Sequence, residues 1–223
     1  MTSLETPPPP SRREARRLDR RDAILMVAQR YFLEHGFAGT TMSGIAAALG
    51  GSKGTLWSHF PSKEALFSAV LDRATRSFQA ELTQILNPCG EVTATLLRAC
   101  NSLIEKLTSP DAIALHRLIV AEGGRFPEMR QIFFDLAPLR VRHMFSTFLQ
   151  GAMARGQLRA ADPFDAARAL IALVMSGSHQ QMMMGQLAQT SSAQTAADAD
   201  FAVTTFLRAY APDSAPSPAG QSA

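Results

Sequence analysis

Residues 41–67 read TMSGIAAALGGSKGTLWSHFPSKEALF, and this stretch decides the fold of the N-terminal part of the chain. Thr41 can cap a short helix, a glycine pair then interrupts it, and Ser52 can cap a second short helix that stops at Pro61. Two short consecutive helices joined by a tight glycine turn are the layout of a helix-turn-helix.

The second of these helices, residues 53–60, is unusual for a core element. Leu56 and Phe60 form an i, i+4 apolar pair, which can anchor the helix on its domain. The other side chains are small, polar or amphipathic, namely Lys53, Gly54, Thr55, Trp57, Ser58 and His59. Such side chains can meet phosphates and base edges in a DNA major groove. The outward face of this helix therefore predicts contact with DNA.

Helical patterning continues along the chain, and no segment shows a convincing period of two. Helices are predicted at 20–35, 41–49, 53–60, 62–86, 92–107, 111–122, 127–136, 138–155, 163–185 and 198–210. The sequence predicts an all-α fold in which an N-terminal three-helix helix-turn-helix domain is joined to a larger helical domain. The expected division is an arm at 1–19, a DNA-binding domain at 20–66, a ligand-binding and dimerisation domain at 67–210, and a disordered tail at 211–223.

Positive charge is concentrated in the first quarter of the chain, although the net charge of the whole sequence is only +3. Residues 1–63 hold nine Lys and Arg against five Asp and Glu, whereas the remainder holds thirteen against fourteen. Four consecutive prolines are followed by a run of arginines that includes Arg12, Arg13, Arg16 and Arg17. This disordered, basic and proline-rich segment is either a solvated, partly helical leader or an arm that lies along DNA, and we favour the arm.

The stretch 41–67 and the ordering of residues around it, from 20 to about 71, resemble the DNA-binding domain of the tetracycline-repressor (TetR) family. The resemblance implies a dimeric transcription regulator that commonly acts as a repressor. It also implies that Thr41 and Lys63 hold phosphates, that residues 53–55 lie nearest base edges, and that Trp57 replaces a tyrosine that reaches the DNA backbone. His59 matches a position in contact with DNA. Two departures are Gly44, at a common capping position, and Gly51, in place of a usual valine.

Residues 75–210 look like the helical ligand-binding and dimerisation domain of the same family, in the subgroup called AefR-like. The strings HRLIVAE at 116–122, RFPE at 125–128 and ARGQLR at 154–159 carry this resemblance. Candidates for a pocket that takes an apolar or amphipathic inducer are His116, Arg117, Phe133, Phe134, Met144, Phe148 and Met183. A Met or Phe at helical spacing is more often simply part of the core, so both readings stay open for each of these residues.

The last two predicted helices are candidates for a homodimer interface. Helix 163–185 is apolar around much of its circumference, and helix 198–210 is apolar on two sides. Pairing two copies into a four-helix bundle covers both sides, and it places two recognition helices about one DNA turn apart on a pseudo-palindromic operator of double-stranded DNA.

Other classes of function find little support in the sequence. No nucleophile–base pair, carboxylate pair or metal-type spacing stands out, so we expect neither an enzyme nor a metal or cofactor site. A regulator that senses thiol oxidation through Cys89 and Cys100 is the alternative. The longest apolar run, 169–175, falls far short of the about 20 residues of a membrane span. We expect a cytoplasmic protein without a membrane partner.

Overall fold

The computed structural model describes residues 12–50, 53–88 and 90–212, and every regular element in these ranges is an α-helix. This confirms the all-α prediction. The helices are α1 Arg12–Gly39, α2 Met42–Ala48, α3 Lys53–His59, α4 Lys63–Ile85, α5 Val92–Leu107, α6 Pro110–Glu122, α7 Pro127–Leu136, α8 Pro138–Ala154, α9 Pro163–Met175, α10 Ser178–Met183 and α11 Ser192–Tyr210. None of the helices in these ranges is long and apolar enough to cross a membrane.

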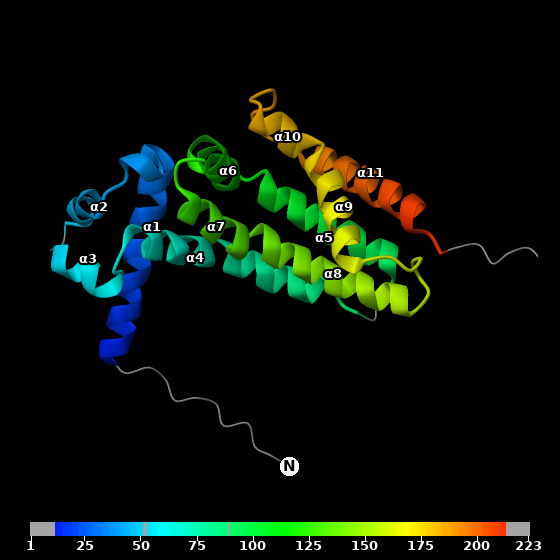
Figure 1. The fold of residues 1–223 in the computed structure, drawn as a ribbon, viewed down its shortest axis with the longest axis horizontal. Coiled ribbons are helices and arrows are strands. Elements are labelled where there is room, and N and C mark those ends of the chain that lie inside the picture. The colour runs from blue at the N-terminus through cyan, green and yellow to red at the C-terminus, as the bar shows by residue number, and fades with distance from the viewer. Residues whose placement is uncertain (1–11, 51–52, 89, 213–223) are drawn as a thin grey trace, which may run out of the picture.

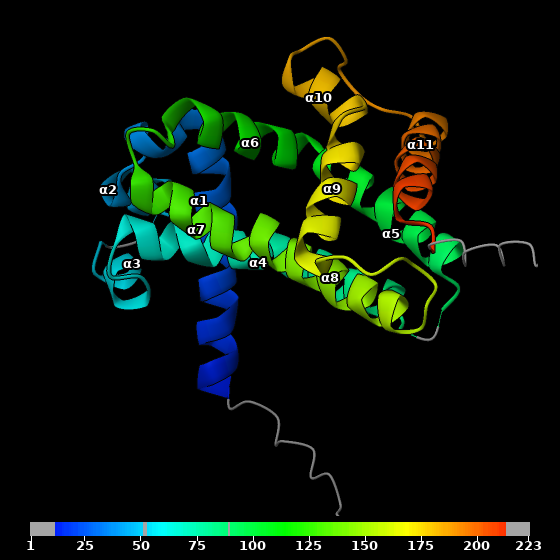
Figure 2. The ribbon, with the colours of Figure 1, turned by 45° about the vertical axis from the view of Figure 1, so that its right-hand side comes forward.

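The molecule is elongated, with α1 to α3 at one end and α9 to α11 towards the other (Figure 1). Helix α4 begins at the end formed by α1 to α3 and runs under α7 and α8 (Figures 1 and 2). The N-terminal half of α1 extends beyond the packed body as a free-standing rod in both views. The helix-turn-helix is therefore carried at one end of the larger domain and linked to it through α4.

Side-chain caps set the boundaries of the helices at the small end, as the sequence indicates. Thr41 Oγ1 accepts the Gly44 N–H at 3.0 Å at the start of α2, and Ser62 Oγ accepts the Ala65 N–H at 3.0 Å at the start of α4. Each bond satisfies one of the backbone donors that a helix N-terminus leaves without an intrahelical partner. Gly50, in the turn after α2, has a φ of +61°, a backbone conformation that favours glycine.

Two apolar cores hold the molecule together. The first lies among helices α1, α2, α3 and α4 and continues into α6 and α7, because Leu118 and Met129 are buried together with Phe32, Phe37 and Phe67. The second lies among α4, α5, α8, α9 and α11, with Leu96, Phe145, Leu170 and Phe206 fully buried. Helix α4 therefore contributes side chains to both cores.

The first helix differs from its predicted start. The sequence places the onset at residue 20, whereas α1 begins at Arg12, so residues 12–19 continue the helix rather than belonging to a disordered arm. Gly36, which was predicted to end this helix, adopts φ +73° and ψ 172°. The regular helix is therefore interrupted at the predicted place, and a short helical segment continues from there to Gly39. Residues 1–11 and the predicted tail beyond 212 lie outside the described residues.

The helix predicted at 163–185 is divided in two, which corrects the sequence interpretation. The division falls at Ser176 and Gly177, where the Asp198 carboxylate of α11 accepts the Ser178 N–H at 2.8 Å. A Cβ at Gly177 would lie 2.6 Å from that carboxylate, so the close approach depends on the glycine. The last helix also begins earlier than predicted, at Ser192, because Ser191 caps it through the Gln194 N–H at 3.2 Å.

Candidate nucleic-acid interface and ligand cavity

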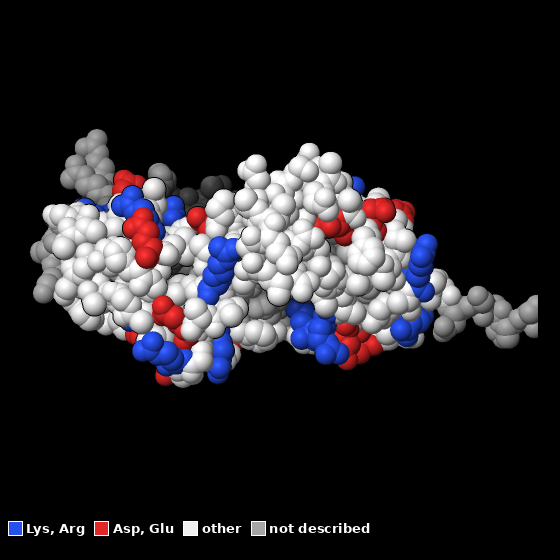
Figure 3. Space-filling view, turned by 90° about the horizontal axis from the view of Figure 1, so that it is seen from above, with Lys and Arg blue, Asp and Glu red and all other residues white. Residues whose placement is uncertain are grey.

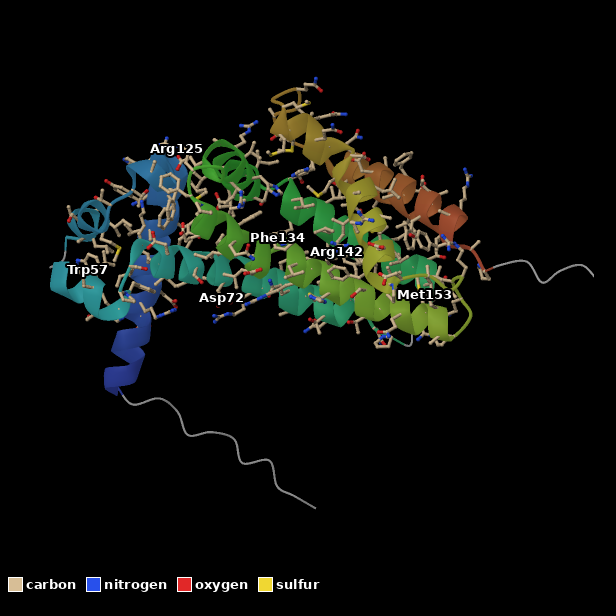
Figure 4. The ribbon with its side chains drawn as sticks, in the orientation of Figure 1. Trp57, Asp72, Arg125, Phe134, Arg142 and Met153 are labelled. Carbon is tan, nitrogen blue, oxygen red and sulfur yellow. The ribbon has the colours of Figure 1, made fainter. Side chains whose placement is uncertain are left out.

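The outward face of α3 is the candidate DNA-reading surface. Leu56 and Phe60 are both buried, which confirms that this pair anchors the helix on the domain. Gly54, Trp57 and Ser58 are exposed, and His59 is half-buried. Trp57 is 49% exposed, and Figure 4 shows it at the outer end of the helix-turn-helix. For Lys53 and Thr55 the structure gives only the helical backbone, and Ser52 and Gly51 lie outside the described residues.

Helix α2 follows α1 and precedes α3, and Thr41 caps its N-terminus. Thr41 is exposed, and its hydroxyl oxygen already accepts the Gly44 N–H. A Cβ at Gly44 would lie 2.6 Å from the Tyr31 hydroxyl and 3.2 Å from Thr41 Oγ1. The Tyr31 ring stacks on His35 with centroids 4.1 Å apart. The glycine that departs from the family pattern therefore makes room for a tyrosine of α1, which gives this departure a structural reason.

Lys63 points away from the reading face. Its Nζ donates to the Phe37 carbonyl at 2.7 Å and lies 4.2 Å from the centroid of the Phe37 ring and 5.7 Å from that of Phe126. The ammonium is thus held at the junction between α1 and the start of α7. The resemblance implies a phosphate contact for this lysine, and in the structure its charge is already engaged with a carbonyl and two aromatic faces.

The four arginines at positions 12, 13, 16 and 17 lie in the first turns of α1. Only their helical backbone is described. The free-standing first part of α1 leaves the body beside α3 and α4 (Figures 1 and 2). These positions are therefore carried on a projecting helix and not on an extended arm, and their contact with DNA remains a prediction.

A second feature is an apolar cavity of about 130 Å³ inside the larger domain. Its wall is formed by α4 to α9. Its lining residues are Thr75, Phe78, Gln79, Leu103, Lys106, Leu107, Ala112, Leu115, His116, Phe133, Ala137, Pro138, Val141, Ile171 and Met175. A concave and mostly apolar space with a few polar groups is the usual form of a small-molecule site.

His116 and His179 form a pair beside this cavity. His116 Nδ1 lies 3.0 Å from His179 Nε2, and the His116 ring meets Phe133 edge-on with centroids 5.3 Å apart. Burial, reinforced by the neighbouring His179, lowers the pKa of His116 to about 4. Burial also lowers the pKa of His179, opposed by a hydrogen bond to the backbone of Met175. Both rings are therefore neutral near pH 7.

Two of the seven predicted ligand residues, His116 and Phe133, line the cavity, and the others lie elsewhere. Arg117 donates to the Met182 carbonyl at 2.6 Å, and Phe134 is 45% exposed on the outer side of α7 (Figure 4). The three remaining candidates are Met144, packed against the core, Phe148, buried in it, and Met183, half-buried in α10. The lining residues on α4 and α5 were not predicted. An apolar stripe on a helix has the same sequence pattern whether it faces a cavity or a packed core.

Helix α6 ties the cavity to the DNA-binding end. Glu122, the last residue of α6, accepts the Ala38 N–H through Oε2 at 2.7 Å, and its carboxylate also packs against Gly36. At the other end of α6, Asp111 accepts a hydrogen bond from Gln29 Nε2 at 2.9 Å. His116 lies on the same helix between these two contacts, so α6 both lines the cavity and contacts α1.

Helix α11 carries an exposed aromatic side chain. Phe201 is 57% exposed, on the side of α11 opposite the buried Val203 and Phe206. Ala172 of α9 is also exposed. Seen from above, the surface over α10 and its neighbours is mostly free of charged side chains (Figure 3). The exposed Phe201 ring makes this side of α11 a candidate for an interface.

Of the two cysteines, Cys100 lies in the described residues, where it is a free cysteine. Cys100 is fully buried in α5, and burial raises the pKa of its thiol to about 12. A thiol in this state is inert, because the thiolate is the reactive form. Cys89 lies outside the described residues. Within the described ranges, no group of three or more His, Cys, Asp or Glu side chains is placed to hold a metal ion.

An outward polar helix in a helix-turn-helix, joined to a helical domain with an apolar cavity, defines the chain as a DNA-binding regulatory protein. Residues 24–70 match the family model of bacterial regulatory proteins of the tetR family, and residues 94–212 match that of the AefR-like transcriptional repressor C-terminal domain. The chain belongs to the TetR family of transcriptional regulators, which confirms the resemblance seen in the sequence.

Individual proteins agree with this assignment. The chain is 41% identical over 61 residues to the HTH-type transcriptional repressor ComR of Escherichia coli (strain K12), a match that spans 27% of this chain and 29% of ComR. A TetR-family regulator from Mesorhizobium loti MAFF303099 superposes with a TM-score of 0.76 at 27% identity, over 87% of this chain and 98% of that one. The flavonoid-responsive regulator FrrA has a TM-score of 0.73 at 28% identity, over 88% of this chain and 99% of FrrA.

Proposed function

We propose that this chain is a ligand-released repressor that binds a pseudo-palindromic operator as a homodimer. The observation that carries the proposal is the shared use of α4 and α6. Both helices line the apolar cavity, and both contact the helices that carry the DNA-reading face. Helices α4 and α6 thus connect a cavity that can bind a small molecule with the helices that are proposed to bind DNA.

The DNA-binding part of the proposal rests on the exposed side of α3. Gly54, Trp57 and Ser58 face outward on a helix whose inner side is fixed by Leu56. The indole N–H of Trp57 is a donor that can reach a phosphate oxygen, and Gly54 permits a close approach of the backbone. The projecting, arginine-rich start of α1 adds sequence-independent attraction that weakens with salt.

The homodimer rests on the exposed face of α9 and α11. Phe201 exposes a large apolar ring to solvent in one copy of the chain, and a second copy that pairs through the same helices covers it. A two-fold symmetric dimer then presents two copies of α3, so the operator is expected to contain two inverted half-sites about one turn of DNA apart.

Release by a ligand follows from differential affinity. A small molecule that prefers a cavity shape incompatible with DNA binding lowers the affinity for DNA by the ratio of its affinities for the two conformers, and by no more. Responsiveness of the similar protein FrrA to flavonoids supports a small-molecule signal for this chain. The thiol-sensing alternative gains no support from Cys100, which is buried and protonated at neutral pH.

Selection of bound sequences from a pool of random DNA duplexes tests the operator and the dimer together. We expect an enriched inverted repeat that binds more weakly as salt increases. We expect the variant Phe201→Arg to sediment as a monomer and to lose affinity for the repeat. Met26→Arg, at a similarly exposed position on α1, is the matched control and is expected to remain dimeric. Enrichment of a sequence without two-fold symmetry, or a dimeric Phe201→Arg variant, would contradict the proposal.

A further inference from the structure

The cavity is sized for a small aromatic ligand. Its volume of about 130 Å³ is similar to that of a cavity of about 150 Å³ in another protein that binds benzene. Phe78, Phe133 and Met175 contribute to an almost entirely apolar wall. One substituted aromatic ring therefore fits the space, and a strongly hydrated ligand does not.

Three polar side chains in the wall are already engaged with backbone carbonyls. Thr75 Oγ1 donates to the Leu71 carbonyl at 2.9 Å, and Gln79 Nε2 donates to the Leu136 carbonyl at 2.9 Å. Lys106 Nζ donates to the Ala74 carbonyl at 2.8 Å. Each of these side chains is thus tied to one backbone carbonyl, and the imidazole of His116 is the further polar group in the wall.

The His116 ring has one nitrogen to spare. Its Nδ1 is taken by His179, and no partner among the described residues bonds to Nε2. Nε2 is also not sealed off, since the buried side-chain polar atoms without a partner in the described residues are Thr95 Oγ1 and Ser178 Oγ. Since the His116 ring lines the cavity, this spare nitrogen is the candidate for a bond to a ligand.

The direction of the hydrogen bonds fixes what this nitrogen can do. The hydrogen bond to the Met175 backbone opposes the lowering of the His179 pKa, and because Nε2 of that ring faces His116, we assign the proton to Nδ1. With this proton in a neutral ring, His179 Nε2 accepts and His116 Nδ1 donates to it. His116 Nε2 is left as a bare acceptor. Burial keeps both rings neutral, which preserves this chain of donors and acceptors.

We propose that the cavity binds a small, uncharged aromatic ligand that carries one hydrogen-bond donor of the phenol type, and that His116 Nε2 accepts this hydrogen bond. A charged ligand would lose its hydration in a mostly apolar space, and a cationic one would in addition lie close to Lys106. The proposal rests on the cavity being the ligand site of the regulator, and it adds the chemical class of the ligand and the residue that selects it.

The test compares two compounds of equal size that differ in the donor, 4-chlorophenol and 4-chlorotoluene. Calorimetric titration of the full-length chain is expected to show about fivefold tighter binding of the phenol, the worth of one hydrogen bond in an apolar site. His116→Phe is expected to abolish or reverse this preference. His143→Phe, the same replacement at an exposed histidine of α8 outside the cavity, is expected to leave the preference unchanged.

A second measurement does not depend on the variants folding well. Long-range ¹H–¹⁵N correlation spectra of the histidine-labelled wild type report which ring nitrogens carry protons. We expect a protonated Nδ1 and a bare Nε2 in His116, with the Nε2 resonance shifting when 4-chlorophenol is added. A protonated Nε2, absence of binding by both compounds, or a phenol preference that persists in His116→Phe would overturn the proposal.

The titrations also separate this proposal from the proposed function. The same compounds are added to the complex of the wild type with its selected duplex. A phenol preference without any loss of DNA affinity would uphold the hydrogen-bond site and contradict ligand release. Release of DNA by both compounds alike would uphold ligand release and contradict the role of His116.

Discussion

The contact between Glu122 and the chain segment before α2 makes the junction of the two cores sensitive to a single side chain. Glu122 Oε2 accepts the Ala38 N–H at 2.7 Å, and Ala38 follows the bend at Gly36. Glu122→Ala removes a charged acceptor from this N–H. A hydrogen bond to a charged group contributes about 1.5 to 3 kcal/mol, and the partial exposure of this one places it at about 1.5 kcal/mol.

Chemical denaturation at fixed protein concentration checks this value. Glu122→Ala is expected to lower the free energy of unfolding by about 1.5 kcal/mol, which corresponds to about 3 to 6 °C in the thermal midpoint of a chain of this length. Glu122→Gln keeps a neutral acceptor and is expected to lose about half as much. Glu105→Ala, at an exposed position of α5, is the matched control and is expected to unfold like the wild type.

Hydrogen exchange locates the effect. The amide of Ala38 is expected to lose protection in Glu122→Ala, whereas amides in the second core, such as that of Leu170, keep theirs. If Glu122→Ala unfolds like Glu105→Ala and the Ala38 amide stays protected, the contact between α6 and α1 contributes nothing, and the route proposed from the cavity wall to the DNA-binding end is wrong.

Three further predictions concern the anchor of α3, the histidine pair and the buried thiol. Leu56→Ala removes the buried anchor of the recognition helix and is expected to cost about 3 kcal/mol in urea unfolding and to weaken DNA binding; an unchanged stability would refute the anchoring role. Because the pKa of His116, about 4, and that of His179 lie below the ordinary 6.5, the native state binds fewer protons than the unfolded state, so the free energy of unfolding should fall as the pH decreases from 6.5 towards 4. His116→Phe should flatten this pH dependence, and an equally steep profile in the variant would count against the pair. Cys100 should react with iodoacetamide only on unfolding, and rapid alkylation of the native chain at Cys100 would revive the thiol-sensing alternative.

Local signals in the sequence account for most of the helices at the DNA-binding end. Thr41 and Ser62 cap α2 and α4 through their own side chains, and Leu56 and Phe60 show which side of α3 faces inward. These features depend on residues within one turn of each other. They can therefore be read from the sequence before any tertiary contact is known.

Contacts between distant residues explain what the sequence did not predict. The break between α9 and α10 depends on Asp198, which lies twenty residues beyond Ser178 and reaches back to its N–H. The position of Lys63 depends on the faces of Phe37, in α1, and of Phe126, which directly precedes α7. Neither contact leaves a periodic or capping signal in the sequence.

The cavity was predicted only in part for the same reason. His116 and Phe133 were among the seven candidates, Phe133 because Phe and Met side chains suit an adaptable apolar pocket. Phe78 and Leu103 form the opposite wall, yet their helical spacing is the same as that of the neighbouring core residues. Only the packing of six helices determines which apolar side chains face a space and which face each other.

The central claim is that the outward face of α3 binds DNA, and Trp57 tests it most directly. Trp57 and Phe134 are aromatic side chains with similar exposure, 49% and 45%, on different parts of the molecule (Figure 4). In titrations of the selected duplex, Trp57→Ala is expected to weaken binding at least about tenfold, and Phe134→Ala is expected to bind like the wild type. Binding by a folded, dimeric Trp57→Ala variant with the affinity of the wild type would contradict the assignment of the reading face to α3.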